Sequence, residues 1–208
     1  MDVNDITYSP PGEKQAEKDA ALQQAQGVLR LMDLSCADDP AWSLQLLHAA
    51  APTVERLSVR GIGEPHLHAV HAMPRLHRLY LECPQDAMRT VPPELGPLPE
   101  GHDGLRWLRA WSLPRGTLQS LLRAHAATLE ELEMWVGSPG KKEWPFSCSD
   151  LHYLLGQCGL QRLRKLLLWR GNCSHSKCKE QLAALSQALP GTEIMCDKCH
   201  GVIYMESA

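Results

Sequence analysis

The residues best suited to chemistry are eight cysteines, four of which lie close together near the end of the chain. Cys173 and Cys178 precede Cys196 and Cys199 with the spacing C-x4-C…C-x2-C. Four sulfur ligands suit a tetrahedral structural zinc ion. The same cysteines could instead form disulfides or remain free thiols, so the sequence leaves three alternatives open. Beyond this zinc, we expect no cofactor.

Two histidines, His175 and His200, lie beside these cysteines and could replace one sulfur ligand. His200 also completes a Cys-x-x-Cys-His string, the attachment motif of c-type haem. We set haem aside because the sequence opens without an export signal. The remaining cysteines are scattered, and we expect Cys36 and Cys83 to lie in the core.

No pattern in the sequence is typical of an enzyme. His66, His68 and His71 form a local group, but they lack the paired glutamate of a metalloprotease motif, and we expect them on a solvated helix. Phosphate-binding loops, dinucleotide fingerprints and the Gly-x-Ser-x-Gly motif are absent from the sequence. We therefore expect a protein without catalytic activity.

A recurring unit, apolar-x-x-apolar-x-apolar, organises most of the chain. Successive copies begin at Leu29, Val54, Leu76, Leu105, Leu129, Leu163 and Leu189. Repeats of about 20–29 residues are typical of leucine-rich repeats, and the two longest steps must carry insertions, near 84–104 and 137–148. The second half of each unit predicts a short strand, and the intervening stretches predict helices at 15–26, 40–50, 65–72, 117–127, 149–157 and 178–188.

These repeats predict an α/β leucine-rich-repeat solenoid of about seven units. It would be a short horseshoe, with a parallel concave sheet and with helices on the convex side, because single units cannot bury their apolar faces alone. A doubly wound α/β sheet is the alternative, disfavoured by the short strands, the regular spacing and the lack of a glycine-rich phosphate loop. The expected parts are a flexible tail and capping helix over 1–27, the repeats over 28–199 and a tail over 200–208.

Four sequence blocks strengthen this expectation: PAWSLQLLHAAAPTVERLSV, MPRLHRLYLEC, LPEGHDGLRWLRAW and LLRAHAATLEELEMWVG. They resemble ribonuclease-inhibitor-like leucine-rich repeats, in particular those attached to F-box domains in expanded arthropod sets. In that family the F-box recruits a ubiquitin-ligase scaffold and the repeats select substrates. The segment 1–27, which precedes the first repeat, contains no evident F-box, so the resemblance implies partner recognition first and a ligase adaptor as the alternative.

The residues that alternate with the inward leucines should point to solvent on the concave side of the sheet. Three tryptophans occupy the same outward position in consecutive copies, and parallel strands about 4.8 Å apart would align them in a row. With their neighbours they have the composition of an interface hot spot. The predicted binding residues are Tyr80, Trp107, Arg109, Trp111, Glu133, Trp135, Leu167 and Trp169. In the alternative, the tryptophans pack as core under the two insertions.

Composition narrows the partner class. The formal net charge is -3, so the chain lacks the basic excess of a nucleic-acid-binding protein. It contains no stretch of 18 apolar residues that could span a membrane. We expect a protein partner and a cytoplasmic or nuclear location, with a secreted, disulfide-bonded repeat protein as the alternative. The sequence does not indicate an oligomeric state.

Overall fold

The fold is built on one open sheet of seven parallel strands, whose order in the sheet is their order in the chain. The computed structural model describes residues 1–83 and 94–202, so 84–93 of the first insertion and 203–208 of the C-terminal tail lie outside the described residues. The strands are β1 (Arg30–Ser35), β2 (Arg56–Arg60), β3 (Arg78–Glu82), β4 (Trp107–Trp111), β5 (Glu131–Trp135), β6 (Lys165–Trp169) and β7 (Glu193–Cys196).

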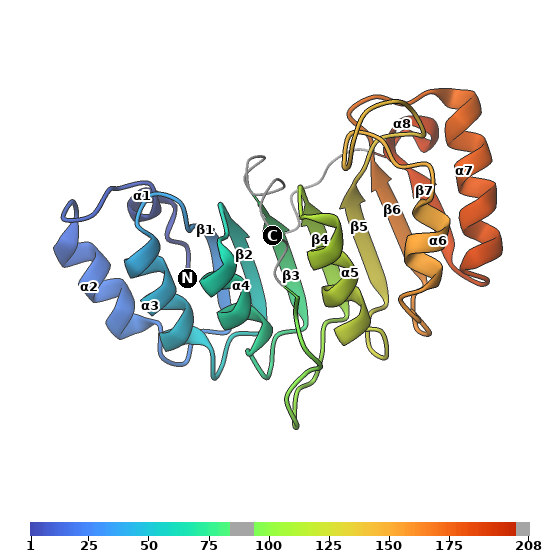
Figure 1. Ribbon diagram of the computed structural model, residues 1–208. Coiled ribbons are helices and arrows are strands. Elements are labelled where there is room, and N and C mark those ends of the chain that lie inside the picture. The colour runs from blue at the N-terminus through green and yellow to red at the C-terminus, as the bar shows by residue number, and fades with distance from the viewer. Residues whose placement is uncertain (84–93, 203–208) are drawn as a thin grey trace.

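The longer helices lie on one side of this sheet (Figure 1). A doubly wound sheet would carry helices on both faces and reverse its strand order, and the sequential order excludes it. The helices are α1 (Asn4–Thr7), α2 (Gln15–Gln24), α3 (Pro40–Ala50), α4 (Glu64–His71), α5 (Arg115–Ala124), α6 (Leu151–Gly156), α7 (His175–Ala188) and α8 (Asp197–His200). Among the residues that the structure describes, no helix is long and apolar enough to cross a membrane.

The core lies between the sheet and the helices, as the alternating apolar positions predict. Its centre is a ladder of leucines that pair across neighbouring strands and are at most 3% exposed: Leu31, Leu57, Leu79, Leu108, Leu132 and Leu166. Cys36 and Cys83 are also buried, as predicted, and burial raises the pKa of each thiol to about 12. These two cysteines are therefore apolar packing residues rather than reactive thiols.

The N-terminal segment packs against the first strand, where the sequence predicts a flexible tail. Asp2 forms an isolated bridge with Met32 of β1. The Thr7 hydroxyl donates to the Ser35 carbonyl at 3.2 Å and accepts from the Ser35 amide at 2.6 Å. Since these contacts occupy the outer edge of β1, the N-terminal segment belongs to the folded unit.

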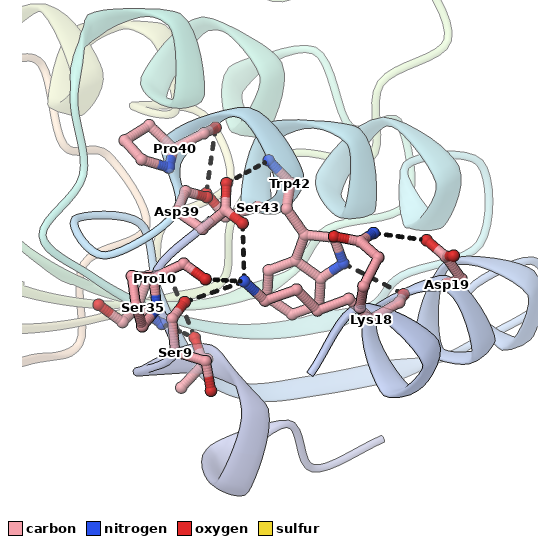
Figure 2. A network of polar contacts seen from close by, with 11 residues as sticks. Ser9, Pro10, Lys18, Asp19, Ser35, Asp39, Pro40, Trp42 and Ser43 are labelled. Carbon is pink, nitrogen blue, oxygen red and sulfur yellow. Dashed lines mark hydrogen bonds and ion pairs between the residues drawn. The ribbon is translucent and has the colours of Figure 1, made fainter. Parts of the chain in front are cut away.

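A fully buried lysine joins this segment to helices α2 and α3 (Figure 2). The Lys18 ammonium donates to the carbonyl oxygens of Ser9 and Pro10, each at 2.9 Å, and to the Asp39 carboxylate at 2.7 Å. Asp39 in turn accepts from the Trp42 amide at 3.2 Å and so caps the N-terminus of α3. All three ammonium protons thus have acceptors, so the buried charge is satisfied.

The second insertion folds back onto the sheet. The Gly137 amide donates to the Pro145 carbonyl at 2.7 Å, and a Cβ at Gly137 would lie 1.7 Å from the Phe146 carbonyl oxygen. Only glycine fits this close backbone approach. The Trp144 indole donates to the Leu113 carbonyl at 2.8 Å, which fastens the tip of the insertion to the preceding repeat.

The described half of the first insertion lies against α4 and α5. The His71 ring bonds the Gly96 carbonyl at 3.0 Å, and the Leu95 amide donates to the Ser120 hydroxyl at 3.1 Å. His71 is therefore not on a solvated helix face as the sequence predicts. The same holds for His66, which is 4% exposed and bonds the Pro40 carbonyl at 3.1 Å.

The pattern Ser147-x-x-Asp150 before α6 has the spacing of a capping box but does not form one. Asp150 occupies the N-cap position of α6 but makes no side-chain capping bond there. Its carboxylate instead accepts two hydrogen bonds from Arg115, at 2.6 and 3.0 Å. The bidentate ion pair with a neighbouring repeat replaces the local cap.

Candidate metal centre and distal face of the sheet

The four C-terminal cysteines converge at the last strand of the sheet. Cys196 ends β7 and Cys199 lies in α8, while Cys173 follows β6 and Cys178 lies in the first turn of α7. Because β6 and β7 are adjacent parallel strands, the segments that leave them emerge at the same edge of the sheet. This topology brings together two cysteine pairs that are far apart in sequence.

The spacing between the sulfurs matches a tetrahedral metal site. The four Sγ atoms all lie within 4.8 Å of one another. The Cys173 sulfur is 3.9 Å from that of Cys196 and 3.5 Å from that of Cys199. A tetrahedron with metal–sulfur bonds of about 2.3 Å has edges of about 3.8 Å, whereas a disulfide needs about 2.05 Å. The four cysteines could hold a metal ion, and all eight cysteines of the chain are free.

The turn that carries Cys196 favours a thiolate. Burial alone would raise the pKa of Cys196, but hydrogen bonds from the amide of Cys199, the Cys178 thiol and the amide of Lys198 outweigh it, and the pKa is lowered. A sulfur that accepts amide hydrogen bonds is already prepared for the negative charge that metal binding requires. The cluster therefore offers two features of a metal site: four sulfurs at the right spacing and hydrogen bonds that stabilise a thiolate.

The predicted histidines flank the cluster. The His200 Nδ1 atom accepts from the Cys196 amide at 3.0 Å, so it braces the backbone of a ligand. The His175 Nδ1 atom lies 3.6 Å from the Cys199 sulfur. Since four sulfurs already converge, neither histidine is needed as a replacement ligand.

A buried arginine beside the cluster is absent from the sequence prediction. Arg170 is 2% exposed, and its guanidinium donates to the Gln181 side chain at 2.6 Å and to the Val136 carbonyl at 3.0 Å. Burial raises the pKa of Cys178, and the positive charge of Arg170 opposes that rise. Arg170 thus supplies a positive charge close to a group of sulfurs that become negative when they bind metal.

The face of the sheet opposite α2–α7, here called the distal face, carries the predicted binding residues in three rows across the strands. The parallel register aligns the middle row without a gap: Ser58, Tyr80, Arg109, Glu133 and Leu167. In the third row Glu82 pairs with Trp111, and Trp135 pairs with Trp169. The middle row is therefore continuous, whereas the β4–β5 register ends at Ala110 and Met134 and does not pair Trp111 with Trp135.

Glu133 is the centre of a polar network on this face. One carboxylate oxygen accepts from the Arg109 guanidinium at 2.8 and 2.9 Å and from the Trp169 indole at 2.9 Å. The side chains of Arg109 and Glu133 are only 6% and 13% exposed. Such a partly desolvated pair is held more rigidly than one on an open surface.

Aromatic rings surround the Arg109 guanidinium. It lies 5.3 Å from the ring centre of Trp107, 5.9 Å from that of Tyr80 and 6.0 Å from that of Trp169. Trp111 packs edge-on against Tyr80 with 5.9 Å between ring centres. We call Arg109, Glu133 and the four rings around them, Tyr80, Trp107, Trp111 and Trp169, the aromatic cluster.

Several of these residues are more buried than the sequence predicts. The alternating pattern places Tyr80, Arg109, Leu167 and Trp169 toward solvent, yet they are between 4% and 9% exposed. Long side chains on strands about 4.8 Å apart cover one another, so the rows bury themselves. Trp107 and Trp111 remain half-buried.

Trp135 belongs to the packing of the second insertion. Its ring meets the Phe146 ring edge-on, with 5.2 Å between centres. A Cβ at Gly171 would lie 3.1 Å from the Trp135 ring. The alternative in which a tryptophan packs under an insertion therefore describes Trp135.

Comparison of the chain with protein-family models, with curated proteins and with solved structures gives no significant match. The residues of the two candidate sites must therefore support any functional argument by themselves.

Proposed function

We propose that this protein is a leucine-rich-repeat solenoid of the ribonuclease-inhibitor-like type that binds another protein through its distal face. The observation that carries the proposal is the aromatic cluster. Aromatic rings and arginine are the side chains most enriched in binding hot spots. The Arg109–Glu133 pair fixes these rings before any partner arrives, so little side-chain entropy is lost on binding.

Half-buried Trp107 is the best candidate for the contact residue. Arg78 and Arg109 place their guanidinium groups 4.7 and 5.3 Å from its ring centre, which orients the indole. Trp169 and Tyr80 are more buried than Trp107, and in this proposal they hold the cluster in place rather than contact the partner. The binding site would thus consist of buried residues that are already fixed in place and a smaller set of half-buried residues that contact the partner.

We further propose that the four C-terminal cysteines hold a structural zinc ion. Four cysteine ligands leave no open coordination position, which is typical of structural rather than catalytic zinc. The ion would join the loop after β6 to the end of β7, and so close the last repeat. Terminal repeats commonly need such a cap because one of their faces has no neighbour.

Partner capture tests the first proposal. Tagged wild-type protein would be incubated with extracts of the source cells, and bound proteins would be compared with those captured by Trp107→Ala. Tyr153→Ala is the matched control, because Tyr153 is a 60% exposed aromatic residue on α6, on the helix side.

We expect Trp107→Ala to lose proteins that the wild type and Tyr153→Ala both retain. Thermal unfolding of the three proteins must coincide within a few degrees, since both substitutions affect exposed or half-buried rings. If Trp107→Ala retained every captured protein, the distal face would not be the binding site.

A further inference from the structure

The first outward row of the distal face has an unusual charge pattern. The parallel register aligns one residue from every strand in this row: Arg30, Arg56, Arg78, Trp107, Glu131, Lys165 and Glu193. On β1–β3 the row is three arginines, on β4 it is a tryptophan, and on β5–β7 it alternates acid, base, acid. We call the first three residues the arginine row.

The two halves of this row differ in electrostatic cost. On β5–β7 Lys165 lies between two glutamates, so each charge faces an opposite charge on the next strand. On β1–β3 each arginine faces another arginine about 4.8 Å away, and like charges directly opposite destabilise a sheet.

Four other arginines of the described residues are paired with acids, namely Arg60, Arg75, Arg109 and Arg115. Arg60 lies 3.4 Å from Asp33, and Arg109 lies 2.8 Å from Glu133. Within residues 1–83 and 94–202, by contrast, no carboxylate lies within ion-pair distance of the arginine row. Arg30 is exposed and the other two are half-buried, so their positive charges are available to a ligand.

We propose that the arginine row binds an acidic helical segment of a protein partner, an inference that rests on the proposed partner-binding function. Acidic residues one helical turn apart are about 5–6 Å from each other, close to the strand spacing of about 4.8 Å. Residues on one side of an extended chain are about 6.6 Å apart and fit less well. Arginine is suited to such carboxylates because its planar fork donates two hydrogen bonds.

The rest of the row limits the ligand to a short acidic stretch. Beyond Trp107 the row turns to Glu131, which would repel a continuing anion. A nucleic-acid strand carries negative charge along its whole length, whereas a helix can present three carboxylates and then apolar side chains. The Arg78 guanidinium, 4.7 Å from the Trp107 ring centre, joins the basic and the aromatic parts of this surface.

The test uses two fluorescent helix-forming peptides of identical composition. One carries three glutamates on a single face, one turn apart, followed by leucines, and the other distributes the same glutamates around the helix. Binding is measured by fluorescence anisotropy to wild-type protein, to the double variant Arg56→Ala/Arg78→Ala and to Lys165→Ala. The last is the matched control, because it removes a positive charge from the compensated half of the same row.

We expect the one-faced peptide to bind the wild type at least about tenfold more tightly than the scrambled peptide, with binding weakened at higher salt. The double variant should lose about tenfold or more in affinity, and Lys165→Ala should lose less than about twofold. The double variant should unfold at about the same temperature as the wild type, since relief of the repulsion offsets the lost contact between Arg78 and the Trp107 ring. A second version, Arg56→Lys/Arg78→Lys, keeps the charges and should retain intermediate affinity.

Three outcomes would overturn the inference: no binding of either peptide, equal losses in the double variant and in Lys165→Ala, or equally tight binding of a single-stranded oligonucleotide of the same charge. None of these affects capture of a partner that depends on Trp107. If Trp107→Ala still abolished that capture, the partner-binding function would stand and only the acidic ligand would be rejected.

Discussion

The two ends of the sheet are closed by different chemistry. At the first strand, Lys18 and Asp39 form a buried pair 2.7 Å apart, and every group in the network belongs to the chain itself (Figure 2). At the last strand, four cysteine sulfurs within 4.8 Å of one another could hold a metal ion. The first end is complete as it stands, whereas the second could hold an ion that the solution must supply.

This difference makes the two ends sensitive to different conditions. A buried ion pair responds to loss of one partner, because the other charge is then left uncompensated. A thiolate–metal cluster responds to chelators, oxidants and protons, each of which competes for the sulfurs. The stability of the first end therefore depends on residues of the chain alone. The stability of the last end, with a metal bound, would also depend on chelators, oxidants and pH.

The largest effect should come from removing metal. Structural zinc contributes about 10–16 kcal/mol of binding free energy in zinc-finger peptides, so its loss should release the C-terminal end first. Hydrogen exchange followed by mass spectrometry should show faster exchange from β6 to α8 after addition of a strong chelator, with β1 and α3 unchanged. Cys196→Ser should reproduce this result, while Cys158→Ala should not. Protein purified without added zinc, free of metal by elemental analysis and equally protected, would contradict the zinc proposal.

Breaking the N-terminal pair should cost less but still be severe. Lys18→Met leaves the Asp39 carboxylate buried without its partner, and we expect a loss of about 3–5 kcal/mol in unfolding free energy. Denaturant titration measures this loss, and zinc content should not change. Lys18→Met/Asp39→Asn removes the stranded charge while keeping an N-cap for α3, so it should recover most of the stability. A double variant as unstable as the single one would show that the charge pair is not what closes this end.

Acid should separate the ends through His125, a buried histidine at the C-terminal end of α5 in the middle of the molecule. Burial, followed by the nearby His71 and His102, lowers the pKa of His125 from 6.5 to about 3. Between these values the unfolded chain binds a proton that the native state does not, so stability is complete above pH 6.5 and is lost as the pH falls. At pH 4.5 the loss should be about 2–3 kcal/mol, and His125→Gln should flatten the profile.

The N-terminal pair should still be intact at that pH. Burial acts to raise the pKa of Asp39, but the bonds from Lys18 and the Trp42 amide lower it below 3.8. A group with a lowered folded pKa stabilises above its unfolded value, so this contribution is lost only as the pH falls below about 3.8. Hydrogen exchange at pH 4.5 should therefore leave β1 and α2 protected. Loss of protection there before the middle of the sheet would reverse the predicted order.

The smallest effect should appear at the aromatic cluster, away from both ends. Glu133→Gln keeps an acceptor for the Trp169 indole but removes the charge opposite Arg109. We expect a loss of about 1–2 kcal/mol by denaturant titration, without any change at either end. Intact stability in this variant would mean that the pair orients the rings without contributing to folding.

The alternating apolar pattern predicted strand positions and register well, because a one-residue shift would turn the leucine ladder toward solvent. That is why the row from Tyr80 to Leu167 could be foreseen. Its burial could not, because burial depends on how side chains of neighbouring strands cover one another. The cysteine spacing likewise predicted a cluster, since both pairs leave adjacent strands at one edge.

The sequence did not predict the roles of two buried charged residues, Lys18 beside the first strand and Arg170 beside the cysteine cluster, and the reason is different. Lys18 meets Asp39 from a distant part of the chain, and no local spacing marks such a pair. Arg170 reaches Gln181 from the end of β6 to α7, and its sequence neighbours resemble those of any exposed arginine. The alternation of apolar and polar residues predicts which face of a strand or helix a residue lies on. It does not predict the partner of a buried charge, because that partner depends on how the helices pack.

The sequential strand order also governs how the chain can fold. Each strand pairs with the next one along the chain, and the steps range from the short one between Arg56 and Arg78 to the longer one between Glu131 and Lys165. Pairing at every step therefore closes a loop of similar length, and loop-closure entropy varies only slowly over this range. Nucleation can begin at any neighbouring pair of strands and spread in both directions. Such low contact order predicts rapid folding for a parallel sheet, a class that otherwise folds slowly.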